Sequence, residues 1–269
     1  MSRIASVFER RAASRSKVLV GYLVAGDPVP AITVPAMHAL VAGGVDIIEL
    51  GMPFSDPEGE GIDIQSGHER ALRAGTRLAD VFEMVRRFRE QDQTTAIVLM
   101  GYVNVVERKG VDVFADLAAD AGADGALLVN LPPEEAQPLR AAFQRRDLDL
   151  ILLIAPTTTD ARAKQILEAT SGFSYYVSLK GTTGSDKLDV EGVRTRLQQL
   201  RAMTSLPLAV GFGIRDGASA QSVAGFADAV VVGSAIVRRM ASGADDVEAL
   251  GADLTSFAGE LRQAMDSGG

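Results

Sequence analysis

The chain has 269 residues, of which 47% are hydrophobic and 23% charged, and its formal net charge is −8. That balance is typical of a globular protein with a substantial core, and the negative charge argues against a nucleic-acid or anionic-membrane surface, because both attract clustered Lys and Arg. The absence of cysteine and the presence of only two histidines exclude disulfides, thiolate metal sites and a His-rich metal site. No stretch approaches the roughly 20 apolar residues of a membrane span and no signal peptide is evident, so we expect a cytoplasmic protein.

Short apolar runs alternate along the chain with segments of helical period. An amphipathic helix comes first, with Ile4, Val7, Phe8 and Ala12 on one face. The candidate strands that follow are 18–24, 45–50, 96–102, 125–130, 148–154, 173–178, 206–211 and 227–232. They are rich in Val, Ile and Leu without strict alternation, which is typical of parallel strands covered on both faces.

The intervening segments carry apolar stripes at helical spacing, for example Val190, Val193, Leu197 and Leu200. Pro133 indicates the start of one helix, and Asp160 is the expected cap of the next. Repeated strand–helix units predict an α/β fold, a single (β/α)8 TIM barrel spanning residues 1–269, with the extra N-terminal helix over the barrel floor. An open doubly wound sheet is the less favoured alternative.

One carboxylate, Glu49, lies near the end of an otherwise apolar strand and is followed at once by a loop rich in Pro, Gly and Asp. A buried glutamate needs a partner, a raised pKa or a chemical role, because an unpaired buried charge is costly. The carboxyl ends of barrel strands present catalytic side chains. We therefore interpret Glu49 as a catalytic candidate, the alternative being a structural glutamate bonded to neighbouring strands.

The last two strands end in small residues, Gly211 to Gly213 in one case and Gly233-Ser234 in the other. Glycines let the backbone approach an anion, and in barrels a phosphate often binds after strands seven and eight at a short helix N-terminus. We predict a phosphate site there, with a short phosphate-binding helix after strand eight. The Gly-rich segment 178–187 is too long for a minimal turn and is interpreted as a closing loop.

Several motifs occur together in this order. They are Glu49-Leu50-Gly51-x-Pro53-Phe54-Ser55-Asp56-Pro57, Met100-Gly101-Tyr102-x-Asn104, Leu131-Pro132, Gly181-x-Thr183-Gly184, Gly211-Phe212-Gly213-Ile214 and Gly233-Ser234-Ala235-Ile236. This set resembles the tryptophan synthase alpha subunit family over almost the whole chain, from Phe8 to Met265.

The resemblance implies a (β/α)8 barrel that cleaves indole-3-glycerol phosphate to indole and glyceraldehyde 3-phosphate without a metal or organic cofactor. Glu49 is implied as the general acid–base, and Glu60 stands where the second catalytic carboxylate is expected. The implied substrate-binding residues are Tyr22, Met100, Tyr102, Leu127, Leu153, Tyr175, Thr183, Gly184, Phe212, Gly213, Gly233 and Ser234. Asp56, Asn104 and Pro132 match positions that face a beta subunit, in an alpha2-beta2 assembly that uses the indole.

Two positions depart from the family pattern, which has an aspartate where Glu60 and Asn130 stand here. Glu60 keeps the charge but adds a methylene, and Gly59 replaces the usual alanine beside it. Glu58 and Asp63 are neighbouring acids able to substitute for it. The segment is alternatively a solvated acidic loop without catalytic duty.

Three functions are compatible with these features. We favour a carbon–carbon lyase acting on indole-3-glycerol phosphate, because Glu49 is retained. A catalytically weakened alpha-like subunit that binds a phosphorylated ligand and activates a beta-type partner is the second. A related barrel acting on a different phosphorylated substrate is the third.

Overall fold

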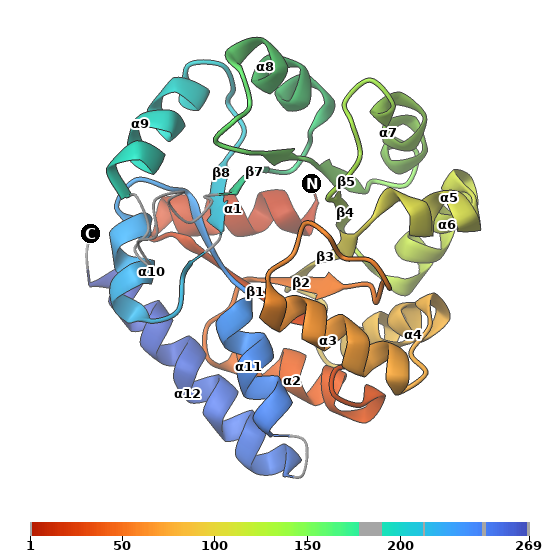
Figure 1. Cartoon of the computed structure of the whole chain (residues 1–269). Helices are drawn as coiled ribbons and strands as arrows, with labels where there is room; N and C mark the ends of the chain where they lie inside the picture. The colour runs from red at the N-terminus through yellow and green to blue at the C-terminus, as the bar shows by residue number, and fades with distance from the viewer. Residues whose placement is uncertain (1, 178–189, 212, 244–245, 268–269) are drawn as a thin grey trace.

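The computed structural model describes residues 2–177, 190–211, 213–243 and 246–267, and Figure 1 shows a ring of strands surrounded by helices. The strands are β1 (Val18–Val24), β2 (Ile47–Gly51), β3 (Ala96–Gly101), β4 (Gly125–Leu128), β5 (Asp149–Ile151), β6 (Leu153–Ile154), β7 (Ser174–Val177), β8 (Leu208–Gly211) and β9 (Ala229–Val232). The helices are α1 (Arg3–Ala13), α2 (Pro30–Ala42), α3 (Ile62–Arg73), α4 (Leu78–Arg89), α5 (Val103–Lys109), α6 (Val111–Ala121), α7 (Ala136–Gln144), α8 (Asp160–Ala169), α9 (Val190–Arg201), α10 (Gly217–Ala224), α11 (Ser234–Ser242) and α12 (Val247–Asp266).

All strand pairings are parallel, in the order β5-β4-β3-β2-β1-β9-β8-β7-β6. The predicted strand 148–154 is divided at Leu152: β5 pairs with β4 on one side, and β6 pairs with β7 on the other. This single stretch of chain therefore joins the two edges of the sheet. The TIM barrel predicted from the sequence is confirmed, with its fifth strand broken in two.

The barrel has two separate apolar layers. Every second residue of a strand points inward, so that Val20, Ile47 and Val98 belong to the interior cluster, whereas Leu19 and Ile48 pack under the surrounding helices. Inward-pointing residues near the carboxyl ends of the strands are the ones exposed at the open end of the barrel.

Helix α1 closes the floor of the barrel, as predicted. Ile4 and Val7 are fully buried in the interior cluster, and the Phe8 ring lies 5.8 Å from that of Phe173, whereas Ala12 is exposed. Deletion of this helix would expose apolar side chains, so α1 is part of the core.

The outer helices follow the predicted stripes with small shifts at their ends. In α4, Val81, Phe82, Val85 and Phe88 are all buried. Thr159, and not Asp160, caps α8, because its hydroxyl accepts the N–H of Arg162. Residues 133–135 form a turn before α7 begins at Ala136. Among the helices in the described ranges, none has both the length and the apolarity needed to cross a membrane.

Candidate active site

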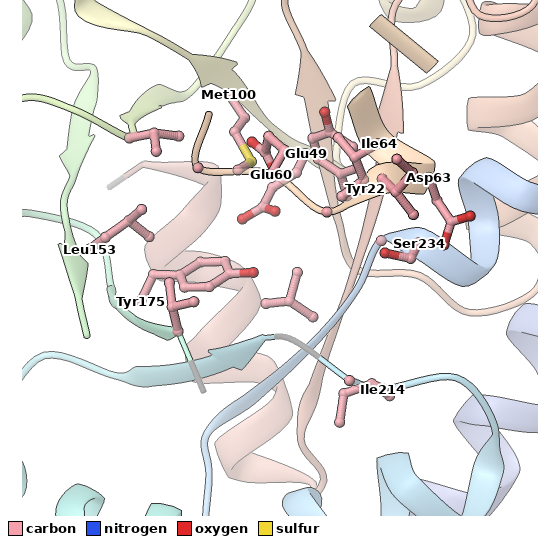
Figure 2. A pocket seen from close by; sticks show the side chains of 18 of the residues that line it. Tyr22, Glu49, Glu60, Asp63, Ile64, Met100, Leu153, Tyr175, Ile214 and Ser234 are labelled. Carbon is pink, nitrogen blue, oxygen red and sulfur yellow. The ribbon is translucent and has the colours of Figure 1, made fainter. Parts of the chain in front are cut away.

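A cavity of about 240 Å³ opens at the carboxyl ends of the strands. Its lining comes from six strands, from the loops after β2, β4 and β8, and from the first turns of α3 and α11. In Figure 2, Glu49 and Glu60 lie close together near Met100, and Ser234 and Ile214 lie on another side of the same cavity. This is the end of a barrel at which active sites are built.

Glu49 is the third residue of β2, in register with Tyr22 of β1 and Val98 of β3. Its side chain is 0% exposed, and neither carboxylate oxygen finds a hydrogen-bond partner among the described residues. Burial first, and then the negative charge of Glu60, raise the pKa of Glu49 to about 8. At neutral pH this is a neutral carboxylic acid with its proton available to a ligand.

Glu60 reaches the same cavity from the loop between β2 and α3. The backbone N–H of Glu60 donates to the carbonyl of Pro57 at 3.0 Å, and that of Gly59 donates to Oη of Tyr102 at 3.0 Å. The amide of Gln65 donates to the carbonyl of Glu60 at 2.9 Å. The loop is thus held on three sides, and burial raises the pKa of its carboxylate to about 7.

The loop also accounts for the glycine beside Glu60. A Cβ at Gly59 would lie only 2.8 Å from Cγ1 of Val129, so with a larger residue either the Val129 side chain or the loop would have to shift. Of the neighbouring acids, Glu58 is exposed and Asp63 is paired with Arg238. Glu60 is therefore the acid of this loop that lies half-buried in the cavity beside Glu49.

A buried hydrogen-bond chain ties this loop to β1. The N–H of Phe54 donates to Nδ1 of His68 at 3.2 Å, which leaves the ring proton on Nε2. Nε2 then donates to Oη of Tyr22 at 3.2 Å. Burial lowers the pKa of His68 to about 4, so the ring stays neutral and the direction of the chain is fixed.

Two glycines make room for the aromatic walls of the cavity. A Cβ on Gly51 would collide with Oη of Tyr22, and one on Gly211 would collide with Oη of Tyr175. Both tyrosines line the cavity. The position of each ring therefore depends on a missing side chain at the end of a strand.

The opposite side of the cavity is formed by the chain ends of β8 and β9. Gly213 has a φ of +80°, which a glycine adopts without strain, and Gly233 is the N-cap of α11. A Cβ on Gly233 would lie 3.4 Å from Ile64 and 3.5 Å from Tyr22, so the backbone passes close to both. The N–H groups of Ile236 and Val237 donate to the carbonyl of Gly233, whereas those of Ser234 and Ala235 have no hydrogen-bond partner among the described residues. These two N–H groups and the Ser234 hydroxyl are favourably placed for an anion.

Acidic and basic side chains occupy different parts of the cavity wall. Glu49 and Glu60 lie at one part of the wall, whereas Arg215 and Arg238 are contributed by the loop after β8 and by α11. Nη1 of Arg238 lies 2.6 Å from Oδ2 of Asp63. The cavity is therefore suited to a ligand with a neutral part and an anionic part.

The structure brings together most of the side chains predicted to bind substrate. Those that line the cavity are Tyr22, Met100, Leu153, Tyr175, Gly213, Gly233 and Ser234. Tyr102 supports the Glu60 loop and stacks on Phe54 at 4.8 Å, and Leu127 is fully buried in the barrel interior without lining the cavity. Thr183, Gly184 and Phe212 lie outside the described residues.

Other cavity residues were not identified from the sequence. Val129 directly follows β4 and Val177 is the last residue of β7, so their place at the carboxyl ends of strands could have identified them. Arg238 follows Ser234 by one helical turn, which places both on one face of α11. His68 gave no such signal, because only the packing of α3 brings it to Tyr22.

Asp56 and Pro132 lie on the loops after β2 and β4, and Asn104 lies in the first turn of α5, which follows β3; all three are at the cavity end of the barrel. Asn130 is bonded within this face: its Oδ1 accepts the N–H of Val103 at 2.8 Å, and its Nδ2 donates to Oδ1 of Asn104 at 3.0 Å. An aspartate would keep the first bond, and it would keep the second only if the Asn104 amide turned over to donate its Nδ2. The amide of Asn130 satisfies both contacts, with Val103 and with Asn104, as it stands.

Comparison with known proteins decides the family. Residues 8–266 match the family described as tryptophan synthase alpha chain. The chain belongs to the tryptophan synthase alpha chain family. The alpha chain of Thioalkalivibrio sulfidiphilus is 54% identical over 99% of this chain and 100% of its own length, and that of Alkalilimnicola ehrlichii is 54% identical over 93% and 91%. The alpha subunit structure from Legionella pneumophila has a TM-score of 0.91 at 41% identity, covering 99% of both chains.

Tryptophan synthase alpha chains are carbon–carbon lyases that cleave indole-3-glycerol phosphate to indole and glyceraldehyde 3-phosphate in tryptophan biosynthesis, and they normally pair with a beta subunit. The function and enzyme class predicted from the sequence are thereby confirmed. The roles of individual residues are a separate question, which the geometry of the cavity addresses.

Proposed function

We propose that this chain cleaves indole-3-glycerol phosphate with Glu49 as the general acid–base and Glu60 as the carboxylate facing the indole nitrogen. The observation that carries this proposal is the pair of carboxyl groups in one largely enclosed cavity, with pKa values of about 8 for Glu49 and about 7 for Glu60. Like charges at close range do not both ionise easily, so the pair holds one proton near neutral pH. The proton resides on Glu49, because its pKa is the higher of the two.

The singly protonated pair has the charges that the reaction needs. Glu49 gives its proton to the indole carbon that carries the glycerol chain, and the ring nitrogen becomes positively charged. The Glu60 carboxylate accepts the N–H hydrogen bond and stabilises that charge. Glu49, now ionised, takes the proton of the adjacent glycerol hydroxyl, the carbon–carbon bond breaks, and its electrons return to the ring. One proton enters and one leaves, so Glu49 ends protonated.

The remaining walls match the rest of the substrate. Tyr175, Leu153 and Met100 offer apolar surface to the indole ring. Gly213, Gly233 and Ser234 are proposed to hold the phosphate through main-chain N–H groups and the hydroxyl. We also propose that Asp56, Asn104 and Pro132 contact a beta subunit, to which indole is passed. The whole chain is proposed to act as one domain.

The test is an indole-release assay with purified protein, with and without a beta subunit. Glu49→Gln should lower kcat by at least a thousandfold, since the variant has no proton to give, while substrate still binds. Glu60→Gln should lower kcat about a hundredfold or more, because the positive ring nitrogen loses its counter-charge. Release of indole by Glu49→Gln at the wild-type rate would disprove the assignment. Stimulation of a beta subunit without any indole release would favour the weakened, regulatory subunit instead.

A further inference from the structure

The ion pair between Arg238 and Asp63 lies at the solvent-exposed rim of the cavity. Both residues line the cavity, and their side chains are 52% and 30% exposed. Figure 2 shows Asp63 and Ser234 on the same side of the cavity. Arg238 follows Ser234 by one helical turn, so its side chain lies along the face of α11 that begins at the proposed phosphate site.

Helices α3 and α11 are in direct contact, which keeps this geometry rigid. A Cβ on Gly67 of α3 would lie 3.1 Å from Cγ1 of Val237, the residue next to Arg238. On the same side, a Cβ on Gly233 would lie 3.4 Å from Ile64, the residue next to Asp63. The backbones of the two helices are therefore held close together, which places Arg238 and Asp63 side by side at the cavity rim.

Main-chain amides and one hydroxyl carry only partial charges, whereas a phosphate monoester approaches a double negative charge at neutral pH. The chain has a formal charge of −8, and two glutamates occupy the same cavity. A guanidinium offers a fork of donors that fits phosphate oxygens and remains charged at all relevant pH values.

We propose that Arg238 is a phosphate-binding residue of this site, and that Asp63 holds it in place and competes with the substrate phosphate for it. The proposal rests on the function proposed above and adds a specificity-determining cation to it. When the phosphate arrives, the guanidinium exchanges the Asp63 carboxylate for phosphate oxygens. Asp63 itself weakens binding, because its negative charge lies beside the incoming dianion.

This competition predicts effects of opposite sign for the two partners. Arg238→Ala should raise the dissociation constant of inorganic phosphate and the KM for indole-3-glycerol phosphate about tenfold, with kcat changed less than threefold. Asp63→Asn should lower both constants severalfold, because it frees the guanidinium and removes a repelling charge. A purely structural ion pair would behave differently, since loss of either partner would then weaken binding equally.

The chain offers a matched control on the same helix. Arg239 is the next residue, and its Nη1 pairs with Asp253 at 2.7 Å without lining the cavity. Arg239→Ala makes the same charge change and should leave phosphate binding and KM unchanged within twofold.

The experiment is calorimetric titration of inorganic phosphate into the full chain and each variant, followed by indole-release kinetics. A rise in both constants for Arg238→Ala with a fall for Asp63→Asn supports the proposal. Equal behaviour of Arg238→Ala and Arg239→Ala overturns it, as does weakened binding in Asp63→Asn. Failure of the wild type to release indole would refute the proposed function instead, and the phosphate titration would still decide the role of Arg238.

Discussion

Replacement of Glu49 by glutamine should make the protein more resistant to unfolding at alkaline pH. Glutamine has nearly the shape of the protonated acid and never ionises. In the wild type, folding raises the pKa of Glu49 from 4.5 to about 8, so the folded state holds a proton that the unfolded state releases. A group of this kind contributes stability that is fully present below the unfolded pKa and is lost as pH rises toward the folded pKa.

The magnitude follows from the two pKa values. Each pH unit between them costs about 1.4 kcal/mol and the slope flattens close to either pKa, so the wild type should lose about 3–4 kcal/mol relative to Glu49→Gln between pH 5 and pH 8. Near pH 5 the two proteins should differ little. Urea unfolding followed by circular dichroism at several pH values would measure the difference. Glu69→Gln, at an exposed helix position, is the control and should show no such trend. A constant difference between wild type and Glu49→Gln over this range would refute the view that Glu49 folds as a neutral acid.

Three other predictions concern activity and packing. kcat/KM for indole release should rise through about pH 7 as Glu60 ionises and fall through about pH 8 as Glu49 loses its proton; a flat profile over pH 6–9 would contradict a singly protonated active pair. Gly211→Ala should force the Tyr175 ring toward the cavity, raising KM and costing about 1–3 kcal/mol of stability in urea unfolding. The comparison is Gly251→Ala, where a Cβ meets nothing within 4 Å and the helix should gain about 0.5–1 kcal/mol. Asn130→Ala loses the hydrogen bonds to Val103 and Asn104 and should lower stability by about 1 kcal/mol, while indole release by the isolated chain stays within twofold; a tenfold loss of activity would show a role beyond local packing.

Much of the architecture was predictable because the relevant signals are local. Apolar runs such as 18–24 were long enough to identify buried strands, and the 3.6-residue stripe of α4 was identifiable without any knowledge of its neighbours. The break at Leu152 was not predictable, because the apolar run of 148–154 continues straight through it. Only the change of hydrogen-bond partner from β4 to β7 divides it.

Some residues of the site were predictable from local sequence, and others were not. Glu49 was conspicuous because a carboxylate inside an apolar strand is rare, and Ser234 was conspicuous because it follows a strand that ends in glycine. The contacts of His68 and Arg238 connect α3 with β1 and with α11, across 46 and 175 residues. No local pattern records such contacts. The close approach of Gly59 to Val129 likewise forms only after folding.

The divided fifth strand has a mechanical consequence. The ring is closed by three paired residues on the β4 side and two on the β7 side, whereas β1 is joined to β2 over five. Leu153, which forms part of the cavity wall, belongs to the shorter of these two seams. A seam with so few backbone bonds is the least costly place for the wall to widen. We therefore expect any widening of the cavity to occur at Leu153, while β1 and β2, and with them Glu49, keep their positions.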